Sequence, residues 1–214
     1  MSATYRTHRG PLLIALALIS TICAIATMIA GDSALNRFDH AIAANLQPLL
    51  TAPMLSTLVA ITHLGDRVTL TILTIVVAGL LLWRGNRTLA IIWVLALAGN
   101  GLFNRIMKAL FQRERPSHLH GLIVETDWSF PSGHSSGAMI GYGLLTFILL
   151  RLFPVARRNA LIAGAALLIG AIGFSRIALQ VHYVSDVIAG FATGAVWLVA
   201  AIAASDHFAA GPQR

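Results

Sequence analysis

The stretch from Ser175 to Asp186 reads SRIALQVHYVSD and separates two long apolar runs in the C-terminal half of the chain. It places ionisable groups at the end of an apolar run, where a charged side chain costs free energy in a membrane. Such groups are therefore commonly functional. If the stretch is helical, His182 and Asp186 are four residues apart and can touch. Ser175 then lies about two turns before His182 on the same face. The spacing favours a histidine oriented by a carboxylate, which makes its other ring nitrogen a better base or nucleophile. A helix end with an interfacial histidine and a capping aspartate is the alternative.

The rest of the chain is apolar enough to be a membrane protein. Of its 214 residues, 57% are hydrophobic and 11% are charged, whereas a soluble domain is about one quarter charged. Runs of about 20 apolar residues recur along the chain, so we expect a single all-α domain over residues 1–214, a polytopic helix bundle. The net charge of +7 comes from basic residues scattered singly between apolar runs, which argues against nucleic-acid binding. The single cysteine, Cys23, excludes an intrachain disulfide and a cysteine-based metal site.

Six transmembrane helices and one interfacial helix are expected. The first apolar run has the order of a signal peptide but is longer than a usual signal sequence, so we favour a retained span over a cleaved one. A short amphipathic helix is expected at about 34–50, because its apolar residues recur at helical spacing. The second span contains an expected irregularity around 65–67. The predicted spans cover approximately 11–30, 54–83, 88–111, 134–153, 159–180 and 186–204.

The distribution of charge predicts the orientation in the membrane. Six spans put both termini on one side, and the basic residues on that side favour the cytoplasm by the positive-inside rule. Seven of the eight acidic residues and the polar loop 112–133 then lie on the outer side. The basic residues that mark the cytoplasmic side are Arg6, Arg9, Arg84, Arg87, Arg151, Arg157, Arg158 and Arg214. We therefore expect a multi-pass membrane protein with cytoplasmic termini, whose polar segments meet at the outer face of the membrane.

Three polar segments far apart in the sequence carry the candidate chemistry at that face. The helix start at 131–134 offers free backbone N–H groups, and Gly133 allows close approach to them, so this junction suits an anion. With the cations Lys108, Arg115 and Arg176 added, the site suits a phosphate dianion. His182, paired with Asp186, can attack phosphorus, and His134 can protonate the departing oxygen. The residue types near these positions require no metal and no cofactor.

Other polar residues receive structural interpretations. Arg105 and Arg113 are read as interfacial anchors rather than residues that steer anionic headgroups. Asn100 and Asn104 are expected to hydrogen-bond between helices. The remaining interpretations are a helix break or an interfacial role at His63 and Asp66, solvated loop histidines at His118 and His120, an interfacial anchor at Trp128 and a structural hydroxyl at Ser175.

Three motifs resemble those of one enzyme family. Residues 108–116, KALFQRERP, fit KxxxxxxRP; residues 131–134 fit PSGH; and residues 175–186 fit SRxxxxxHxxxD. Together they are similar to the signature of the type 2 phosphatidic acid phosphatases, the lipid phosphate phosphatases related to vanadium haloperoxidases. The resemblance implies a six-span, metal-independent phosphatase with a phosphohistidine intermediate. His182 would be the nucleophile, Asp186 its orienting partner and His134 the acid. The phosphate would be held by Lys108, Arg115, Ser132, Gly133 and Arg176.

The sequence thus predicts a membrane lipid phosphatase whose substrate comes from the bilayer. Small bacterial members of the family act on phosphatidylglycerophosphate, phosphatidic acid or undecaprenyl diphosphate at the outer face of the inner membrane. The resemblance therefore implies a bacterial inner-membrane protein with a periplasmic site, but the sequence does not choose among these lipids. Nothing in it indicates an obligatory protein partner. Two alternatives stay open: transfer of the same phosphate to an acceptor lipid, and a transporter that binds the anion without cleaving it. Against the transporter stand the absence of inverted repeats and the gathering of charge at one face, away from the midplane.

Overall fold

The computed structural model describes residues 9–29, 31, 33–116, 123 and 125–209. The expected features at Arg6, His118, His120 and Arg214 lie outside these residues. Within the described chain every regular element is helical. The elements are α1 (Arg9–Met28), α2 (Ala34–Leu46), the 3-10 turn η1 (Gln47–Leu49), α3 (Ala52–His63), α4 (Arg67–Trp83), α5 (Arg87–Phe111), α6 (Gly133–Leu152), α7 (Arg158–Ala178) and α8 (Val184–Ala209).

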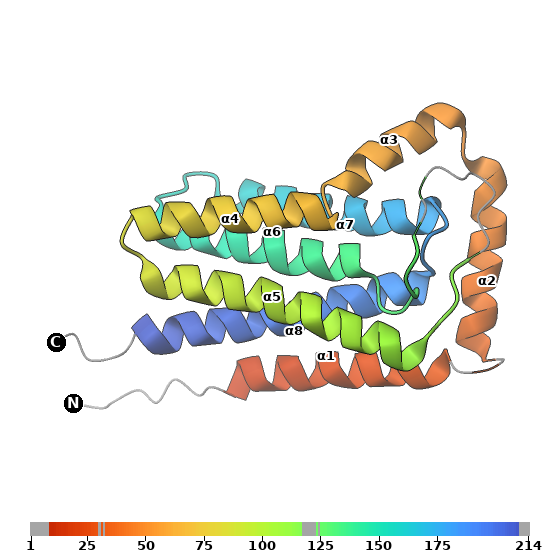
Figure 1. The fold of residues 1–214 in the computed structure, drawn as a ribbon, viewed down its shortest axis with the longest axis horizontal. Helices are drawn as coiled ribbons and strands as arrows, with labels where there is room; N and C mark the ends of the chain where they lie inside the picture. Colours follow the sequence, from red (N-terminus) through yellow and green to blue (C-terminus); the bar gives the residue numbers. More distant parts are fainter. Residues whose placement is uncertain (1–8, 30, 32, 117–122, 124, 210–214) are drawn as a thin grey trace.

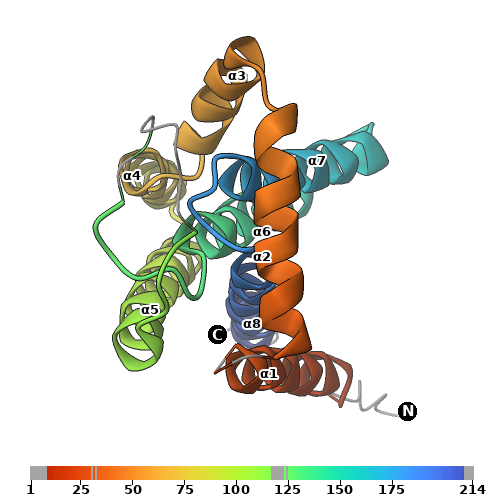
Figure 2. The same cartoon turned by 90° about the vertical axis from the view of Figure 1, so that its right-hand side faces the viewer.

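Six roughly parallel helices form the bundle, and a short helix crosses one end of it. In Figure 1, α1, α4, α5, α6, α7 and α8 run side by side, whereas α2 runs across their right-hand ends. Figure 2, which looks onto that end, shows α2 lying over the ends of α6 and α8. The described residues contain six segments long and apolar enough to cross a membrane, with α3 and α4 counted as one. The prediction of an all-α, multi-pass membrane fold is confirmed.

The irregularity expected in the second span is a break between two helices. The chain leaves helix between His63 and Arg67, and α3 turns away from the bundle axis (Figure 1). Asp66 caps α4 by accepting a hydrogen bond from the Thr69 backbone N–H at 2.7 Å, and the Tyr142 hydroxyl donates to the Leu64 carbonyl at 2.7 Å. These two contacts satisfy backbone groups that a membrane would otherwise leave unpaired. The break brings the end of α3 against the bundle, where Thr62 contacts the site described below.

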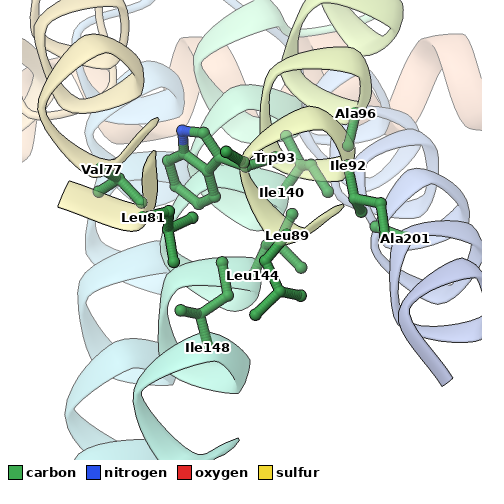
Figure 3. Close-up of a cluster of buried hydrophobic side chains, with 11 residues drawn as sticks. Val77, Leu81, Leu89, Ile92, Trp93, Ala96, Ile140, Leu144, Ile148 and Ala201 are labelled. Atoms are coloured by element: carbon green, nitrogen blue, oxygen red, sulfur yellow. The ribbon is translucent and has the colours of Figure 1, made fainter. Parts of the chain in front are cut away.

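A cluster of apolar side chains joins four helices in the half of the bundle away from α2. Trp93 of α5 is fully buried at its centre, and its indole N–H donates to the Thr74 carbonyl of α4 at 3.1 Å. The cluster draws on α4, α5, α6 and α8 and is shown in Figure 3. Because lipid is as apolar as these side chains, close packing rather than the hydrophobic effect holds the helices together. The labelled members are Val77, Leu81, Leu89, Ile92, Trp93, Ala96, Ile140, Leu144, Ile148 and Ala201.

Two glycines let α8 approach the backbone of α6. A Cβ at Gly190 would lie 2.6 Å from the Ser132 carbonyl oxygen, and one at Gly194 would lie 2.4 Å from that of Ser136. Real Cβ atoms do not come so close, so only glycine fits at either position. This contact fixes the start of α6 against the start of α8, the two elements that carry PSGH and the aspartate of the third motif.

The structure has a helix, α2, where the sequence predicts the interfacial helix, and one polar residue on it faces the protein. Asp39 is 1% exposed, whereas the neighbouring Phe38 is 50% exposed. The amide of Gln180 ties α2 to the α7–α8 connection by donating to the Ala43 carbonyl at 2.6 Å. The buried carboxylate of Asp39 is therefore part of the site below.

Candidate active site

The three motif segments meet at the end of the bundle that α2 covers. The C-terminal end of α5, the start of α6 and the α7–α8 connection all lie there, together with the described parts of the loop that joins α5 to α6 (Figure 1). The stretch 175–186 is not a continuous helix, because α7 ends at Ala178 and α8 begins at Val184. Gln180 adopts φ 54° in the turn between them. The turn places His182 two residues before α8, close to Asp186 in the first turn of that helix.

The predicted histidine–aspartate pair is present, and a third residue links its members. Nδ1 of His182 lies 3.6 Å from Oδ2 of Asp186. The Ser129 hydroxyl donates to the same carboxylate oxygen at 2.5 Å and lies 3.3 Å from Nδ1. The Tyr183 backbone N–H donates to this oxygen at 2.9 Å. One edge of the imidazole is thus held, and Nε2 on the other edge faces Arg115 Nη1 at 3.1 Å.

Arg115 and Lys108 lie beside the free edge of His182. Arg115 donates from Nη1 to the Val181 carbonyl at 2.5 Å and from Nη2 to Oδ1 of Asp127 at 2.5 Å. The ammonium of Lys108 donates to the Trp128 carbonyl and lies 3.5 Å from the same Asp127 oxygen. Burial raises the pKa of Asp127, but the charges of Lys108 and Arg115 outweigh it and hold that pKa below its usual value. Asp127 therefore stays ionised between these two cations.

The third predicted cation, Arg176, is fully buried and paired in the same way. Its guanidinium donates to Oε1 of Glu125 and to the Thr62 hydroxyl, the latter at 2.8 Å. Its Nε has no partner among the described residues. All three predicted phosphate-binding cations thus converge on one place, where they pair with two carboxylates of the α5–α6 connection.

The PSGH segment contributes the start of α6. Ser132 caps the helix: its hydroxyl accepts from the Ser135 backbone N–H at 3.4 Å and from the Ser135 hydroxyl at 2.9 Å. Its own backbone N–H donates to the Asp186 carbonyl at 3.0 Å. Gly133 and His134 follow, and both line the central cavity. No atom lies within 4 Å of the place where a Gly133 Cβ would be, so there is room beside its backbone.

A cavity of about 510 Å³ connects the motif residues with the apolar faces of α4 and α5. Lys108, Arg115, His134 and His182 line its polar end. Its other end is lined by apolar residues that include Leu70, Ile75, Val94 and Leu97. The cavity has the mixed lining that a molecule with a polar head and apolar tails requires.

Burial and charge keep His182 neutral. His182 is 2% exposed, and its burial, followed by the charges of Arg115, Arg176 and Lys108, lowers its pKa well below 6.5. A neutral imidazole with Nδ1 on the Ser129–Asp186 side has its Nε2 lone pair available towards Arg115. That is the protonation state a nucleophilic histidine needs.

The sequence did not predict a buried ion-pair network that joins Asp186 to Arg113 and Asp39. Arg113, interpreted above as an interfacial anchor, donates to Oδ1 of Asp186 at 2.6 Å and to Oδ2 of Asp39 at 2.8 Å. Asp39 also accepts from Ser185, from its backbone N–H at 3.1 Å and from its hydroxyl. The Arg113 guanidinium lies over the Tyr183 ring, 4.3 Å from its centroid. Burial opposes the charge on Arg113, but Asp186 and Asp39 outweigh it, so its pKa is raised. The interfacial-anchor interpretation of Arg113 is wrong.

Several structural interpretations are confirmed. The amides of Asn100 and Asn104 donate across the helix interface to the Ser136 hydroxyl, at 3.3 Å and 2.7 Å. The hydroxyl of Ser175 donates to the Ile172 carbonyl at 2.6 Å and has a structural role. His63 contacts Asp66 at 3.2 Å in the break before α4. Within the described residues, no group of three or more His, Cys, Asp or Glu side chains could hold a metal ion.

The fold and this arrangement define the class: a multi-pass membrane protein that buries a histidine–carboxylate pair beside a cluster of cations. The chain belongs to the PAP2 superfamily, whose sequence model matches residues 89–208. The match covers all three motifs, and members of this family include the phosphatases described next. The chain is accordingly an enzyme, a phosphatase.

Named relatives and solved structures agree with this membership. Phosphatidylglycerophosphatase B of Bacillus subtilis is 32% identical over 152 residues, which is 68% of this chain and 73% of that protein. The lipid A 1-phosphatase of Rhizobium etli is 39% identical over 104 residues, 44% of this chain and 41% of that protein. The crystal structure of a transmembrane PAP2-type phosphatidylglycerolphosphate phosphatase from Bacillus subtilis superposes with a TM-score of 0.86 at 25% identity, covering 92% of this chain and 98% of that one. Aquifex aeolicus LpxE shares the fold, with a TM-score of 0.60 at 20% identity over 84% of this chain and 99% of that one.

Proposed function

We propose that this enzyme hydrolyses a lipid phosphate or diphosphate through a covalent phosphohistidine on His182, at the periplasmic face of a bacterial inner membrane. The observation that carries the proposal is the asymmetry of the His182 ring. Ser129 and Asp186 lie at Nδ1, whereas Nε2 faces Arg115 at the polar end of the cavity. Nδ1 is therefore oriented by Ser129 and Asp186, whereas Nε2, beside Arg115 at the cavity, is the nitrogen that can attack phosphorus.

The proposed first step forms the phosphohistidine. Nε2 of His182 attacks phosphorus, and the bond from phosphorus to the lipid oxygen breaks. His134 gives its proton to the departing oxygen. Lys108, Arg115 and Arg176, with the backbone at Gly133, stabilise the negative charge on the equatorial oxygens. For this to happen the phosphate replaces the carboxylates of Asp127 and Glu125 on those cations.

The second step returns the enzyme to its starting state. His134, now neutral, takes a proton from water as the water oxygen attacks phosphorus. The bond from phosphorus to Nε2 breaks, inorganic phosphate leaves, and His134 is protonated again. Asp186 stabilises the imidazole while it carries the phosphoryl group. Ser132 supports the site by holding the start of α6 and the Asp186 carbonyl.

The cavity supports a substrate drawn from the bilayer. Its apolar end lies between α4 and α5, so the tails of a lipid can stay among apolar side chains while the headgroup reaches His182. Both termini would then be cytoplasmic, as the positive-inside rule favours. A cysteine-accessibility experiment on the connections at each end of the bundle tests this orientation.

The mechanism is tested with a histidine variant. His182→Ala in detergent should abolish phosphate release from phosphatidic acid, phosphatidylglycerophosphate and undecaprenyl diphosphate, and His207→Gln, at the far end of α8, should not. Activity of the unaltered enzyme should persist in EDTA. Acid-labile, base-stable label retained on the protein from a 32P-labelled lipid should disappear in His182→Ala. Hydrolysis that survives in His182→Ala, or that stops with the chelator, would contradict the proposal. Label that passes to an added acceptor lipid instead of water would show a phosphotransferase.

A further inference from the structure

We propose that Arg67 and Arg105 form a subsite for a second phosphoryl group, so that the preferred substrate carries another phosphoryl group between the scissile phosphate and its apolar tails. Neither residue belongs to the three motifs. The inference rests on the proposed function above, because it takes His182 as the position of the scissile phosphate.

The orientation of Arg115 separates the two subsites. Its Nη1 faces His182 Nε2 at 3.1 Å, so the scissile phosphate belongs on this side. Its Nη2 instead binds Oδ1 of Asp127 at 2.5 Å. The carboxylate of Asp127 thus lies next to the scissile position, across the Arg115 guanidinium, and we place the next group of a substrate there.

The second oxygen of Asp127 points to Arg67. Oδ2 of Asp127 lies 3.6 Å from Nη2 of Arg67. The single carboxylate of Asp127 therefore contacts the motif cations Lys108 and Arg115 through Oδ1 and Arg67 through Oδ2. A phosphoryl group attached directly, or by a short linker, to the scissile phosphate occupies the same bridging position when Asp127 moves aside.

The course of the cavity adds Arg105. On α4, Arg67 is the first residue, and the apolar lining residues Leu70 and Ile75 follow. On α5 the order is reversed: Val94 comes first, then Arg105, then Lys108 at the polar end. A lipid whose tails contact the apolar residues therefore passes Arg67 and Arg105 before its headgroup reaches His182.

The cavity lining carries more positive than negative charge, which favours binding of a second anionic group. The lining includes four cations, Arg67, Arg105, Lys108 and Arg115, but only two carboxylates, Glu125 and Asp127. The Arg67 side chain is 78% exposed, and Arg105 is also exposed and forms no ion pair with another described residue. Guanidinium groups suit bidentate binding of a phosphoryl group. A headgroup with a single phosphate, such as that of phosphatidic acid, would leave Arg105 without an anion and Arg67 with only its contact to Asp127.

Two lipid types share the required chemistry. In a polyprenyl diphosphate the second phosphoryl group is bonded directly to the scissile one, and in phosphatidylglycerophosphate a glycerol separates them. In both lipids the second phosphoryl group lies between the scissile phosphate and the apolar tails. The experiment therefore includes both lipids and uses phosphatidic acid as the single-phosphoryl reference.

The test compares kcat/KM for the three lipids in mixed micelles across charge-neutral variants. The variants are Arg67→Gln, Arg105→Gln and the double substitution, with Arg87→Gln, an exposed arginine at the far end of α5, as the matched control. The unaltered enzyme should prefer a two-phosphoryl lipid over phosphatidic acid by at least about tenfold. The double substitution should lower kcat/KM for that lipid by about 10–100-fold, as expected for lost charge-assisted hydrogen bonds. It should change kcat/KM for phosphatidic acid by less than about threefold, and Arg87→Gln should change neither.

The outcomes separate this inference from the proposed function. A larger loss on undecaprenyl diphosphate than on phosphatidylglycerophosphate assigns the subsite to a directly bonded phosphoryl group, and the reverse assigns it to a linked one. An equal loss on all three lipids would overturn the inference, because the arginines would then act on the scissile phosphate or on membrane binding in general. No loss on any lipid would also overturn it and make them interfacial anchors. If the unaltered enzyme released phosphate from none of the lipids, the proposed function itself would fail.

Discussion

Replacing Arg113 by glutamine should impair both folding and catalysis, because it leaves two buried carboxylates without their cation. Arg113 binds Asp186 at 2.6 Å and Asp39 at 2.8 Å, and both carboxylates are 1% exposed or less. Breaking a buried ion pair by removing one partner costs about 3–5 kcal/mol. Asp186 keeps hydrogen bonds from Ser129 and Tyr183, and Asp39 keeps those from Ser185. We therefore expect the lower end of that range, about 3 kcal/mol.

The catalytic effect should appear in kcat more than in KM. Arg113 holds Asp186, not the substrate, so its loss misplaces the partner of His182 without removing a phosphate contact. Residues that orient a functional group from behind it typically contribute about 10–100-fold, and we expect kcat to fall by this factor. Phosphate release from a lipid in detergent measures kcat and KM, and thermal unfolding in the same detergent measures stability.

A double-mutant cycle tests whether the network acts as a unit. Asp39→Asn alone should cost about 1.5–3 kcal/mol, the value of a hydrogen bond to a charged group. Combined with Arg113→Gln it should cost clearly less than the sum, because the second change removes a carboxylate that the first left unpaired. Arg151→Gln is the control, since its ion pair with Asp206 is exposed and such pairs contribute at most about 1 kcal/mol. Additive costs in the cycle, or a rise in KM at unchanged kcat, would refute this reasoning.

Two further predictions concern packing and pH. Gly194→Ala should destabilise the protein by about 1–3 kcal/mol, because its Cβ would lie 2.4 Å from the Ser136 carbonyl oxygen. Gly79→Ala is the control and should not destabilise the protein, because its Cβ would meet no neighbouring atom. Equal melting temperatures for the two variants would contradict the packing argument. His182 has a pKa well below 6.5 in the folded protein, so below pH 6.5 the unfolded chain binds a proton that the folded chain does not. The free energy of unfolding should therefore fall with decreasing pH by up to about 1.4 kcal/mol per unit. His182→Asn should reduce the slope between pH 7.5 and 5.5, and an unchanged slope would show that His182 does not titrate in this way.

The sequence predicted the parts of the site that lie within short motifs. The spacing within 175–186 indicated contact between His182 and Asp186 although the chain between them is not one continuous helix. Topology then predicted that Lys108, Arg115 and the start of α6 would meet them, since helices of alternating direction bring these segments to one end. The bundle, the crossing helix and the break in the second span were predicted from hydropathy and from the polar residues at 65–67.

What the sequence did not show depends on pairs of residues far apart along the chain. Asp39 pairs with Arg113, 74 positions away, and no local spacing indicates such a contact. The one available signal was the placement of Asn36 and Asp39 three residues apart on one face of α2, since both contact Arg113. The contact of Ser129 with Asp186 was not predicted for the same reason, because the two residues are 57 positions apart. The pairing of Asp127 and Glu125 with the cations was also unexpected, because acidic residues in a loop usually face solvent.

These two loop carboxylates have a consequence for turnover. Asp127 and Glu125 already pair with Arg115, Lys108 and Arg176. In the proposed mechanism, substrate entry would therefore exchange one set of anions for another, and the net affinity would be only the difference between the two. A lipid offsets this difference with the contacts of its tails, but free phosphate has no such contacts. The enzyme's own carboxylates thus compete with the product for the cations, which favours rapid phosphate release and weak product inhibition.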